Sequence, residues 1–525
     1  MTGPASPLVL AVDCSTTAAK AVALDAEGRV AASAARPLDL RRPAPGQHEQ
    51  DAEQWWSATV GALAETVAAL GPDGAARVAA IGITHQRESF ACLDADGRAV
   101  RPAILWLDSR ASAEIAELGS DRVRDLSGKP PDVTPSLYKL AWLARHEPDA
   151  LHGAAQVAEV HGFLAGRLTG RHVTSTASAD SLGLLDLAAG DWSPELLALA
   201  GVRRDQLADL VPPGAVIGPL LPDVVTRLGL PGPVPLVAGI GDGQAAGLGA
   251  DVTTAGVGYL NLGTSMVMGV PAREYLTGPA FRTLAGAPAG TFVLETVLNA
   301  ASYLASWFRR EFGDPRLAGG LDPALEAAAA ALPPGADGLL TTPYWNCAQT
   351  PYWDTAARGA VVGWHGGHTR AHLYRSLLEG VAFELRLHLD GLEAATGTRV
   401  ELLRAMGGGS RSPLWQQIVA DVTGRPVELC AGEEISARGA AVLAWAGAGL
   451  PVDDGRAAGD GGSEGGRSED GARVAAVARA MASFGATIEP RAEVTGDYDR
   501  LFAVQRRIYP ALRDVFAALA TIASP

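Results

Sequence analysis

A strand–turn–strand pattern that occurs once near the start of each half of the chain constrains the fold most. The first copy has apolar runs at residues 8–13 and 19–24 around a hydroxyl-rich turn at 14–17. The second has runs at 257–262 and 266–270 around a turn at 263–265. Short β-rich runs on both sides of a small polar turn predict a hairpin. Two such hairpins predict a duplicated α/β fold in which two domains flank a cleft.

The remaining segments fit this two-domain organisation. We expect one domain over residues 1–251 and a second over 252–525, with helices and buried strands between the hairpins. The expected helices are 51–70, which stops at Gly71-Pro72, and 138–146, 373–389, 414–423, 474–484 and 498–517. The expected buried strands are 79–84, 236–240 and 401–406.

Composition limits the kinds of partner that this chain can have. It has 525 residues, 48% hydrophobic and 19% charged, which is typical of a globular protein. The net charge of −15 argues against nucleic acid or an anionic membrane as partner. The four cysteines lie far apart, and no signal peptide or membrane span is evident, so we expect a cytosolic protein without a zinc site or disulfide framework.

Residues 453–471 differ from the rest of the second domain. They are rich in Gly, Asp, Glu and Ser and contain almost no large apolar residue. Such a composition cannot bury enough apolar surface to offset the entropy of ordering, so we expect a flexible insertion or solvated linker that activity does not need.

The first hairpin turn has the chemistry of a phosphate site. Asp13 ends a strand, and the hydroxyl and amino groups of Ser15, Thr16, Thr17 and Lys20 follow it. N–H and O–H donors at a tight turn can hold phosphate, and the carboxylate could orient a metal-bound water. A plain hairpin turn is the alternative. Gly263 and Thr264 form the matching turn in the second half, and would place a second donor set across the cleft.

A glycine-rich turn indicates a nucleotide site. Gly407, Gly408 and Gly409 follow the strand 401–406, and Ser412 and Pro413 suit the start of the next helix. Three glycines let a ligand approach the backbone at the positive end of that helix. A plain strand-to-helix turn is the alternative reading.

Two further segments carry groups suited to a hydroxylated substrate. Asp242 follows the strand 236–240 and starts a helix, where it can stay ionised and accept a proton, or alternatively only cap the helix. Arg87 and Glu88 follow the strand 79–84, and Trp106 and Asp108 come soon after. An Arg–Glu pair can bind a polyol and an indole can pack on a sugar, although a surface ion pair and a core tryptophan would look the same.

Together these segments resemble the FGGY family of carbohydrate kinases, which includes xylulokinase, gluconate kinase, ribulokinase and glycerol kinase. The resemblance covers about residues 8–450, and its most specific stretch begins at Gly407 with GGGSRSPLWQQIVADVTGRPVEL. Further segments that resemble sequences typical of the family are SLYKLAWL from Ser136, HGFLAGRLTG from His161, PYWDTAARGAVVG from Pro351 and LEGVAFELR from Leu378.

The resemblance implies an actin-like ATPase fold with two ribonuclease-H-like domains, ATP and Mg²⁺ as cofactors, and a small sugar or polyol as substrate. It implies that Asp242 is the general base and that Asp13 and Asp242 are the carboxylates at the metal site. It places Thr264 and the first hairpin turn at the phosphates, and the glycine turn in the nucleotide site. A homodimer is left open.

Departures from the family pattern leave the substrate open. Relatives usually have glycine at the position of Ser15, and xylulokinases usually have Gln-Met-His where this chain has Gln86-Arg87-Glu88. The Arg–Glu pair resembles glycerol kinase, yet Thr134 stands where glycerol kinase has a substrate-binding tyrosine. We expect a xylulokinase-like ketopentose kinase, with a glycerol kinase-like enzyme or a non-catalytic ATP-binding protein of the same fold as alternatives.

Overall fold

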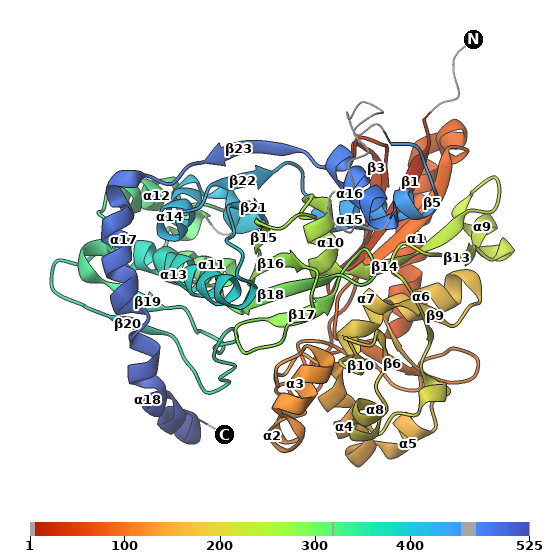
Figure 1. Ribbon diagram of the computed structural model, residues 1–525, viewed down its shortest axis with the longest axis horizontal. Coiled ribbons are helices and arrows are strands. Elements are labelled where there is room, and N and C mark those ends of the chain that lie inside the picture. The colour runs from red at the N-terminus through yellow and green to blue at the C-terminus, as the bar shows by residue number, and fades with distance from the viewer. Residues whose placement is uncertain (1–5, 318–319, 453–468, 524–525) are drawn as a thin grey trace, which may run out of the picture.

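The computed structural model describes residues 6–317, 320–452 and 469–523. Two lobes lie side by side, and each is built around one large mixed sheet (Figure 1). The sheet of the first lobe has the spatial order β13-β14-β5-β1-β2-β3. The bounds of these strands are β13 Val216–Pro219, β14 Pro235–Gly241, β5 Val78–His85, β1 Leu8–Cys14, β2 Ala18–Leu24 and β3 Val30–Pro37.

The second sheet has the order β17-β18-β16-β15-β21-β22-β23. The bounds are β17 Arg282–Ala285, β18 Phe292–Leu298, β16 Met266–Ala272, β15 Val257–Leu262, β21 Leu402–Met406, β22 Val427–Cys430 and β23 Phe484–Ile488.

Both sheets share one topology. In each, a hairpin (β1–β2, β15–β16) continues antiparallel into a third strand (β3, β18), and two further strands (β5 and β14, β21 and β22) lie parallel on the other side. This is the strand order of a ribonuclease-H-like domain. The parallel strands β1 and β14 of the first sheet are mostly apolar and buried, because helices cover both of their faces. The structure therefore confirms the predicted duplication.

Helices complete the first lobe. The face of the first sheet that packs on α1 also buries residues of α6 and α9. The helices of this half are α1 Ala52–Ala75, α2 Ser112–Leu118, α3 Asp121–Ser127, α4 Ser136–His146, α5 Pro148–His152, α6 Val160–Thr169, α7 Thr176–Ala179, α8 Pro194–Ala200, α9 Pro222–Leu228 and α10 Asp242–Gly249.

The second lobe packs α11, α12, α13 and α14 on one face of its sheet, and α17 and α18 join the same core at its outer edge (Figure 1). The helices of this half are α11 Ser302–Phe312, α12 Pro323–Ala330, α13 Arg370–Thr396, α14 Pro413–Thr423, α15 Ile435–Gly447, α16 Glu469–Met481, α17 Ala492–Gln505 and α18 Ile508–Ala523.

Short strands form small additional sheets outside the two large ones. One is four-stranded and the others are pairs. Their bounds are β4 Glu49–Gln50, β7 Ala103–Ile104, β6 Phe90–Leu93 and β8 Gln156–Glu159 for the four-stranded sheet, and β9 Val173–Ser175 with β12 Asp209–Val211, β10 Leu185–Asp186 with β11 Asp191–Trp192, and β19 Leu340–Thr342 with β20 Ala360–Val362 for the pairs.

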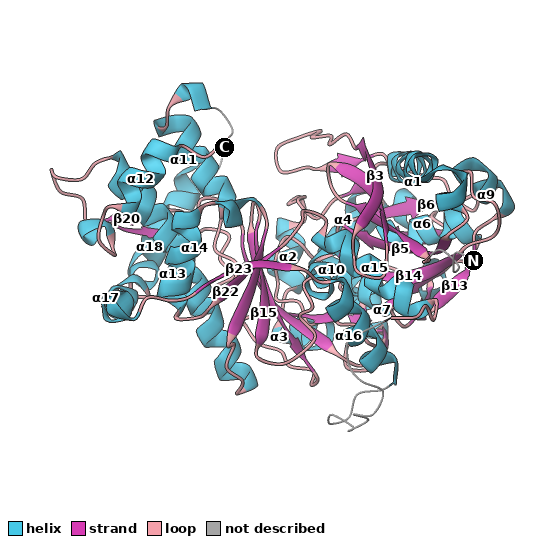
Figure 2. Cartoon of the chain, turned by 90° about the horizontal axis from the view of Figure 1, so that it is seen from above, coloured by secondary structure: helices cyan, strands magenta, loops and turns pink. Residues whose placement is uncertain are grey.

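Two helices cross between the lobes (Figure 2). Helix α10 from the first half packs on the second sheet, whereas α15 from the second half packs in the core of the first sheet. The crossing is close because small residues face each other. A Cβ at Gly249 would lie 2.0 Å from the Ile435 carbonyl oxygen, and a Cβ at Gly439 would lie 1.9 Å from that of Ala245. The chain therefore exchanges a helix between its two halves.

Most predicted elements are present, with four corrections. The first helix was predicted to stop at Gly71-Pro72, but it only bends at Gly71 (φ 68°), and four more residues follow before it ends at Ala75. The predicted helix 474–484 is α16 followed by the unpredicted strand β23, and the predicted helix 498–517 is divided between α17 and α18. Of the predicted insertion, residues 453–468 lie outside the described residues, and 469–471 are helical instead.

No helix within the described ranges is both long enough and apolar enough to cross a membrane.

Candidate functional site

The carboxyl ends of the parallel strands in the first lobe bring three predicted segments together. Asp13 lies near the end of β1, beside Thr84 of β5, and Gly241 at the end of β14 lies beside His85. Asp242 and Arg87 therefore start from adjacent strand ends. In open α/β sheets, ligands bind outside these carboxyl ends.

Asp242 is the first residue of α10 and faces a guanidinium. Its Oδ1 accepts a hydrogen bond from Arg87 Nε at 2.9 Å and another from the Gly243 amide at 2.8 Å. Burial raises the pKa of Asp242 above its ordinary value; Arg87 opposes this shift, and Glu88 adds to it. Because 42% of the side chain is exposed and both bonds use Oδ1, Oδ2 can accept a proton from a bound hydroxyl.

Arg87 and Glu88 belong to a buried charge network that joins the lobes. Arg87 Nη2 donates to Glu295 Oε1 at 3.0 Å. Arg282 donates from Nε to Glu295 Oε1 at 2.8 Å and from Nη1 to Glu88 Oε1 at 2.9 Å. The Tyr259 hydroxyl donates to Glu295 Oε2 at 2.6 Å. Burial alone would raise the pKa of Glu295, but Arg87 and Arg282 outweigh it and lower the pKa to about 2.

The sequence analysis missed Glu295, Arg282 and Tyr259. They line up across the second sheet, because Tyr259 pairs with Gly269, Gly269 with Glu295, and Glu295 with Arg282. A lone carboxylate inside the apolar run of β18 was the available signal, since buried charges need partners.

Two features of the Arg87–Glu88 pair point to a ligand. Glu88 has a φ of 53°, a strained conformation that concentrates at functional sites. Arg87 Nη1 is buried, and no described residue accepts a hydrogen bond from it. Arg87 therefore has one donor left for a bound molecule although its other nitrogens are engaged.

Trp106 contacts the first hairpin turn. Its indole Nε1 donates to Thr16 Oγ1 at 2.9 Å, and Thr16 Oγ1 donates to Gln86 Oε1 at 3.1 Å. Trp106 thus joins the predicted phosphate turn to the segment after β5.

Asp108 lies apart from this group. It is fully buried, and its oxygens accept hydrogen bonds from Arg110 at 2.7 and 2.8 Å and from the His48 amide at 2.6 Å. Burial alone would raise its pKa, but the hydrogen bonds from Arg110 and His48 lower it. This geometry favours a structural role for Asp108 over the predicted contact with substrate.

Polar groups from both lobes meet near Thr134. Asp132 Oδ2 accepts from Thr134 Oγ1 at 3.2 Å and from Gln349 Nε2, in the other lobe, at 2.8 Å. The Lys139 ammonium donates to the carbonyls of Thr134 at 2.8 Å and Trp106 at 3.3 Å, and burial lowers its pKa to about 8. Sequence analysis did not select Asp132 or Gln349.

Asp13 is held in a strongly perturbed state. Burial and the neighbouring carboxylates of Asp242 and Glu434 raise its pKa to about 7, against the smaller opposing effect of Lys20. Its Oδ1 is buried, with no hydrogen-bond partner among the described residues. Lys20 forms an ion pair with Glu434 just before α15, so the first hairpin also contacts the second half of the chain.

The second hairpin turn and the glycine turn lie against each other. Gly407 has a φ of 90°, and a Cβ there would lie 2.5 Å from Asn261 Oδ1 and 3.0 Å from the Gly263 nitrogen. A Cβ at Gly408 would meet no heavy atom within 4 Å, so this exposed residue borders open space. Thr264 is also exposed. The surface around Gly408 and Thr264 can therefore accept a ligand.

Ser412 differs from its glycine neighbours. It caps α14 by accepting from the Trp415 amide at 3.1 Å, as predicted, and its hydroxyl donates to Glu326 at 2.7 Å. The Ser412 side chain is buried, and its hydroxyl both accepts and donates a hydrogen bond, so it stabilises the turn. Direct contact of Ser412 with the nucleotide stays a prediction.

A divalent cation that shares its shell with phosphates fits the donors present. No group of three or more metal-ligating side chains occurs in the part of the chain that the structure describes. Mg²⁺ takes only one or two carboxylates, with water and phosphate oxygens as its other ligands. The unpartnered, buried Oδ1 of Asp13 suits that kind of site.

Comparisons with known proteins identify the family. Family models described as the N-terminal and C-terminal domains of the FGGY family of carbohydrate kinases match residues 8–249 and 258–448. The chain is 33% identical to the xylulose kinase of Escherichia coli over 444 residues, which cover 83% of this chain and 89% of the relative. It is also 33% identical to the glycerol kinase of Bordetella parapertussis over 463 residues, which cover 84% and 88%.

Solved structures agree with the sequence comparison. The xylulose kinase structure from Rhodospirillum rubrum matches with a TM-score of 0.85 at 29% identity, over 97% of this chain and all of the other. Both lobes therefore have the predicted actin-like ATPase fold. The chain belongs to the FGGY family of carbohydrate kinases, which are phosphotransferases that phosphorylate an alcohol group of a sugar or polyol with ATP.

Proposed function

We propose that this kinase phosphorylates a ketopentose such as D-xylulose. One observation carries the proposal: the partly exposed carboxylate of Asp242 lies beside Arg87, whose Nη1 has no described partner, at the carboxyl ends of β5 and β14. Such a site offers a proton acceptor and a hydroxyl-binding donor side by side.

The first lobe supplies the substrate groups. Asp242 Oδ2 takes the proton from the attacking hydroxyl, and Arg87 Nη1 donates a hydrogen bond to a second hydroxyl of the same sugar. Glu88 accepts from a neighbouring hydroxyl, and the indole of Trp106 packs on the C–H side of the sugar. The shared hydrogen bonds with Glu295 and Arg282 hold Arg87 and Glu88 in place.

The second lobe and the two hairpins supply the nucleotide groups. The backbone from Gly407 to Gly409 lies along the nucleotide, and Gly408 leaves room for its approach. Thr264 and the turn with Ser15, Thr16, Thr17 and Lys20 donate to phosphate oxygens.

Asp13 would hold Mg²⁺ through water or directly, with Asp242 on the same side, and the ion would neutralise charge on the phosphates. The neighbouring carboxylate of Asp242 contributes to the raised pKa of Asp13, which supports a shared role of both carboxylates at one end of the site.

The residue at position 134 favours ketopentose over glycerol. The resemblance puts a substrate-binding tyrosine of glycerol kinases at this position, whereas this chain has a threonine whose hydroxyl donates to Asp132. The similarity to xylulose kinases extends to full-length structures. Glycerol remains the second candidate, because Arg87 and Glu88 form the pair that resembles glycerol kinases.

A coupled assay of ADP formation with D-xylulose, D-ribulose, glycerol, erythritol and D-gluconate tests the proposal. We expect the highest kcat/KM with D-xylulose and only slow ADP formation without sugar. The Arg87→Met, Glu88→His double variant should shift preference further toward D-xylulose and away from glycerol. A wild-type preference for glycerol, or a ratio of kcat/KM for D-xylulose to kcat/KM for glycerol that the double variant leaves unchanged, would contradict the assignment, and no sugar-stimulated turnover would refute catalysis.

A further inference from the structure

Two buried side chains beside Thr134, Asp132 from the first half and Gln349 from the second, form an acceptor pair. Asp132 is 5% exposed and Gln349 is 2% exposed. Gln349 Nε2 donates to Asp132 Oδ2 at 2.8 Å, and the Thr134 hydroxyl donates to the same oxygen at 3.2 Å. Because both hydrogen bonds use Oδ2, Asp132 Oδ1 can accept from a further donor.

Gln349 supplies the second acceptor of the pair. Its Oε1 is buried, and no described residue donates a hydrogen bond to it. The side-chain amide directs its nitrogen toward Asp132, because an ionised carboxylate can only accept hydrogen bonds. A buried acceptor without a donor destabilises the folded protein unless a bound molecule supplies the donor. The pair therefore suits a molecule that presents hydroxyl groups.

Lys139 connects the acceptor pair to the predicted sugar site. Its ammonium donates to the carbonyl of Thr134 at 2.8 Å and to that of Trp106 at 3.3 Å. Burial lowers the pKa of Lys139, and the carboxylates of Glu88 and Asp132 oppose that shift. Glu88, which is expected to bind the sugar, and Asp132 therefore lie near one buried cation.

Strand β18 connects the other half of the pair to the charge network. The Val297 amide donates to Thr350 Oγ1 at 3.1 Å, and the Thr350 amide donates to the Val297 carbonyl at 3.3 Å. Thr350 directly follows Gln349 in the chain. Val297 lies two residues beyond Glu295, which binds Arg87. Gln349 is therefore held near the end of β18 that carries the charge network.

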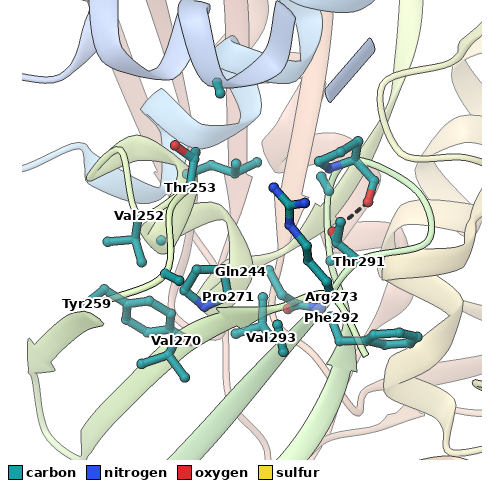
Figure 3. Close-up of a pocket in the computed structure, with 18 of the residues that line it drawn as sticks. Gln244, Val252, Thr253, Tyr259, Val270, Pro271, Arg273, Thr291, Phe292 and Val293 are labelled. Atoms are coloured by element: carbon teal, nitrogen blue, oxygen red, sulfur yellow. Dashed lines mark hydrogen bonds between the residues drawn. The ribbon is translucent and has the colours of Figure 1, made fainter. Parts of the chain in front are cut away.

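The acceptor pair is separate from a cavity of about 470 Å³ that lies between α10 and the ends of β16 and β18 (Figure 3). Tyr259 and Gln244 line that cavity, whereas Asp132 and Gln349 do not. The contacts of the pair with Thr134 and, through it, with Lys139 instead place it on the wall of the predicted sugar site.

The number of hydroxyls in a substrate decides whether the acceptor pair is used. In the proposed function, Asp242, Arg87 and Glu88 each contact one hydroxyl, and these contacts use all the hydroxyls of glycerol. A ketopentose has a further hydroxyl for the pair. A carboxylate at that end of the substrate has no proton to donate and would meet the charge of Asp132 with a like charge.

We propose that Asp132 and Gln349 determine specificity for a substrate that is longer than glycerol and ends in a hydroxyl. Asp132 Oδ1 and Gln349 Oε1 accept hydrogen bonds from the end of the sugar that is far from Asp242, and they disfavour a substrate that ends in an acid, such as D-gluconate. This inference rests on the proposed function, because it extends the same substrate site.

Replacement of Asp132 by Asn tests the pair with almost no change in size. Gln349 and Thr134 both donate to Oδ2, so the asparagine keeps its oxygen there and presents an N–H donor in place of Oδ1. If both amides turn over, the donor replaces Gln349 Oε1 instead. In Asp132→Asn the ratio of kcat/KM for D-xylulose to kcat/KM for glycerol should fall at least about tenfold, and the ratio for D-gluconate to glycerol should rise.

A second carboxylate between the halves provides the matched control. Asp125 Oδ1 accepts from Thr277 Oγ1 at 2.8 Å, and Asp125 is exposed. Asp125→Asn should keep both wild-type ratios, because this carboxylate does not belong to the acceptor pair. If Asp132→Asn unfolds, Gln349→Met gives the D-xylulose comparison, since it removes the second acceptor.

Calorimetric titration of D-xylulose and glycerol without ATP adds a measurement that does not depend on turnover. The wild type should bind D-xylulose more tightly than glycerol, and Asp132→Asn should lose this difference. A wild type that binds D-xylulose but does not phosphorylate it would refute the proposed function and leave the binding difference to decide on the pair. Wild-type ratios in Asp132→Asn, or a wild type that binds D-xylulose no more tightly than glycerol, would overturn the role of the pair.

Discussion

The carboxylates of Asp13 and Asp242 are kept in positions that oppose their ionisation. Burial and the neighbouring acids Asp242 and Glu434 raise the pKa of Asp13 to about 7 from a reference of 3.8. Asp13 therefore binds its proton more tightly in the folded protein than in the unfolded chain. Between about pH 4 and 7 the contribution of Asp13 to the free energy of unfolding should consequently fall as pH rises.

Replacement of Asp13 by Asn removes this destabilising charge. At pH 8 in the presence of a chelator, Asp13→Asn should increase the free energy of unfolding by up to about 4 kcal/mol, and the gain should vanish near pH 4. Its kcat should fall, because the metal-side carboxylate is lost. Denaturation at both pH values checks this, with the exposed Asp223→Asn as control. A variant less stable than the wild type at pH 8 would contradict the account.

At the residue scale, sequence reasoning found the groups that follow strands and missed those inside them. Asp242, Arg87 and Glu88 could be found because a polar run directly after a buried strand is unusual. Glu295 offered one signal, a carboxylate inside an apolar run, but its partner Arg282 depends on cross-strand pairing that the local sequence pattern does not reveal. Asp108 and Ser412 were also predicted as ligand groups. The structure shows that each has protein partners, and the contact of these two residues with a ligand stays a prediction.

The glycine turn shows how neighbouring residues of one element can serve different purposes. Gly407 needs its hydrogen side chain for the fold, because φ is 90° and Asn261 and Gly263 lie too close for a Cβ. Gly408 has no such constraint from the protein. A glycine that the fold does not require, next to one that it does, is consistent with close approach of a ligand.

This difference predicts opposite behaviour for two adjacent substitutions. Gly408→Val should leave Tm close to that of the wild type and weaken ATP binding at least tenfold in calorimetry, while sugar binding is retained. Gly407→Val should instead destabilise the protein by about 1–3 kcal/mol through backbone strain and the clash with Asn261. Unchanged ATP affinity in Gly408→Val would remove this turn from the nucleotide site.

At the scale of elements, the hydrophobic pattern predicted the central strands correctly but did not predict the elements near the end of the chain correctly. The strands β1, β5 and β14 are apolar over most of their length and were recognised. The strand β23 was not, because its residues Phe484–Ile488 are an edge strand with mostly exposed side chains. The hydrophobic pattern also could not show that α15 packs in the core of the first half. An apolar helix face has the same sequence pattern whichever core it packs into.

At the scale of the whole molecule, the proposed active site exists only because both halves contribute to it. Lys129 in the first half forms a buried ion pair with Asp180 and donates to the Thr283 carbonyl of β17 at 2.7 Å. Arg87 contacts Glu295 in the same way from the cleft. These contacts, with the crossed helices α10 and α15, hold Asp242 at a defined place relative to the glycine turn.

The most direct test of this account is the rate of phosphoryl transfer from ATP to D-xylulose in a single turnover, compared between the wild type and Asp242→Asn. If Asp242 is the general base, the rate should fall about 10²–10⁴-fold. The Kd for ATP should not rise, and the Tm at pH 8 should not fall, beyond the values of the Asp223→Asn control. A transfer rate in Asp242→Asn equal to that of the wild type would contradict the assignment of Asp242 and the mechanism built on it.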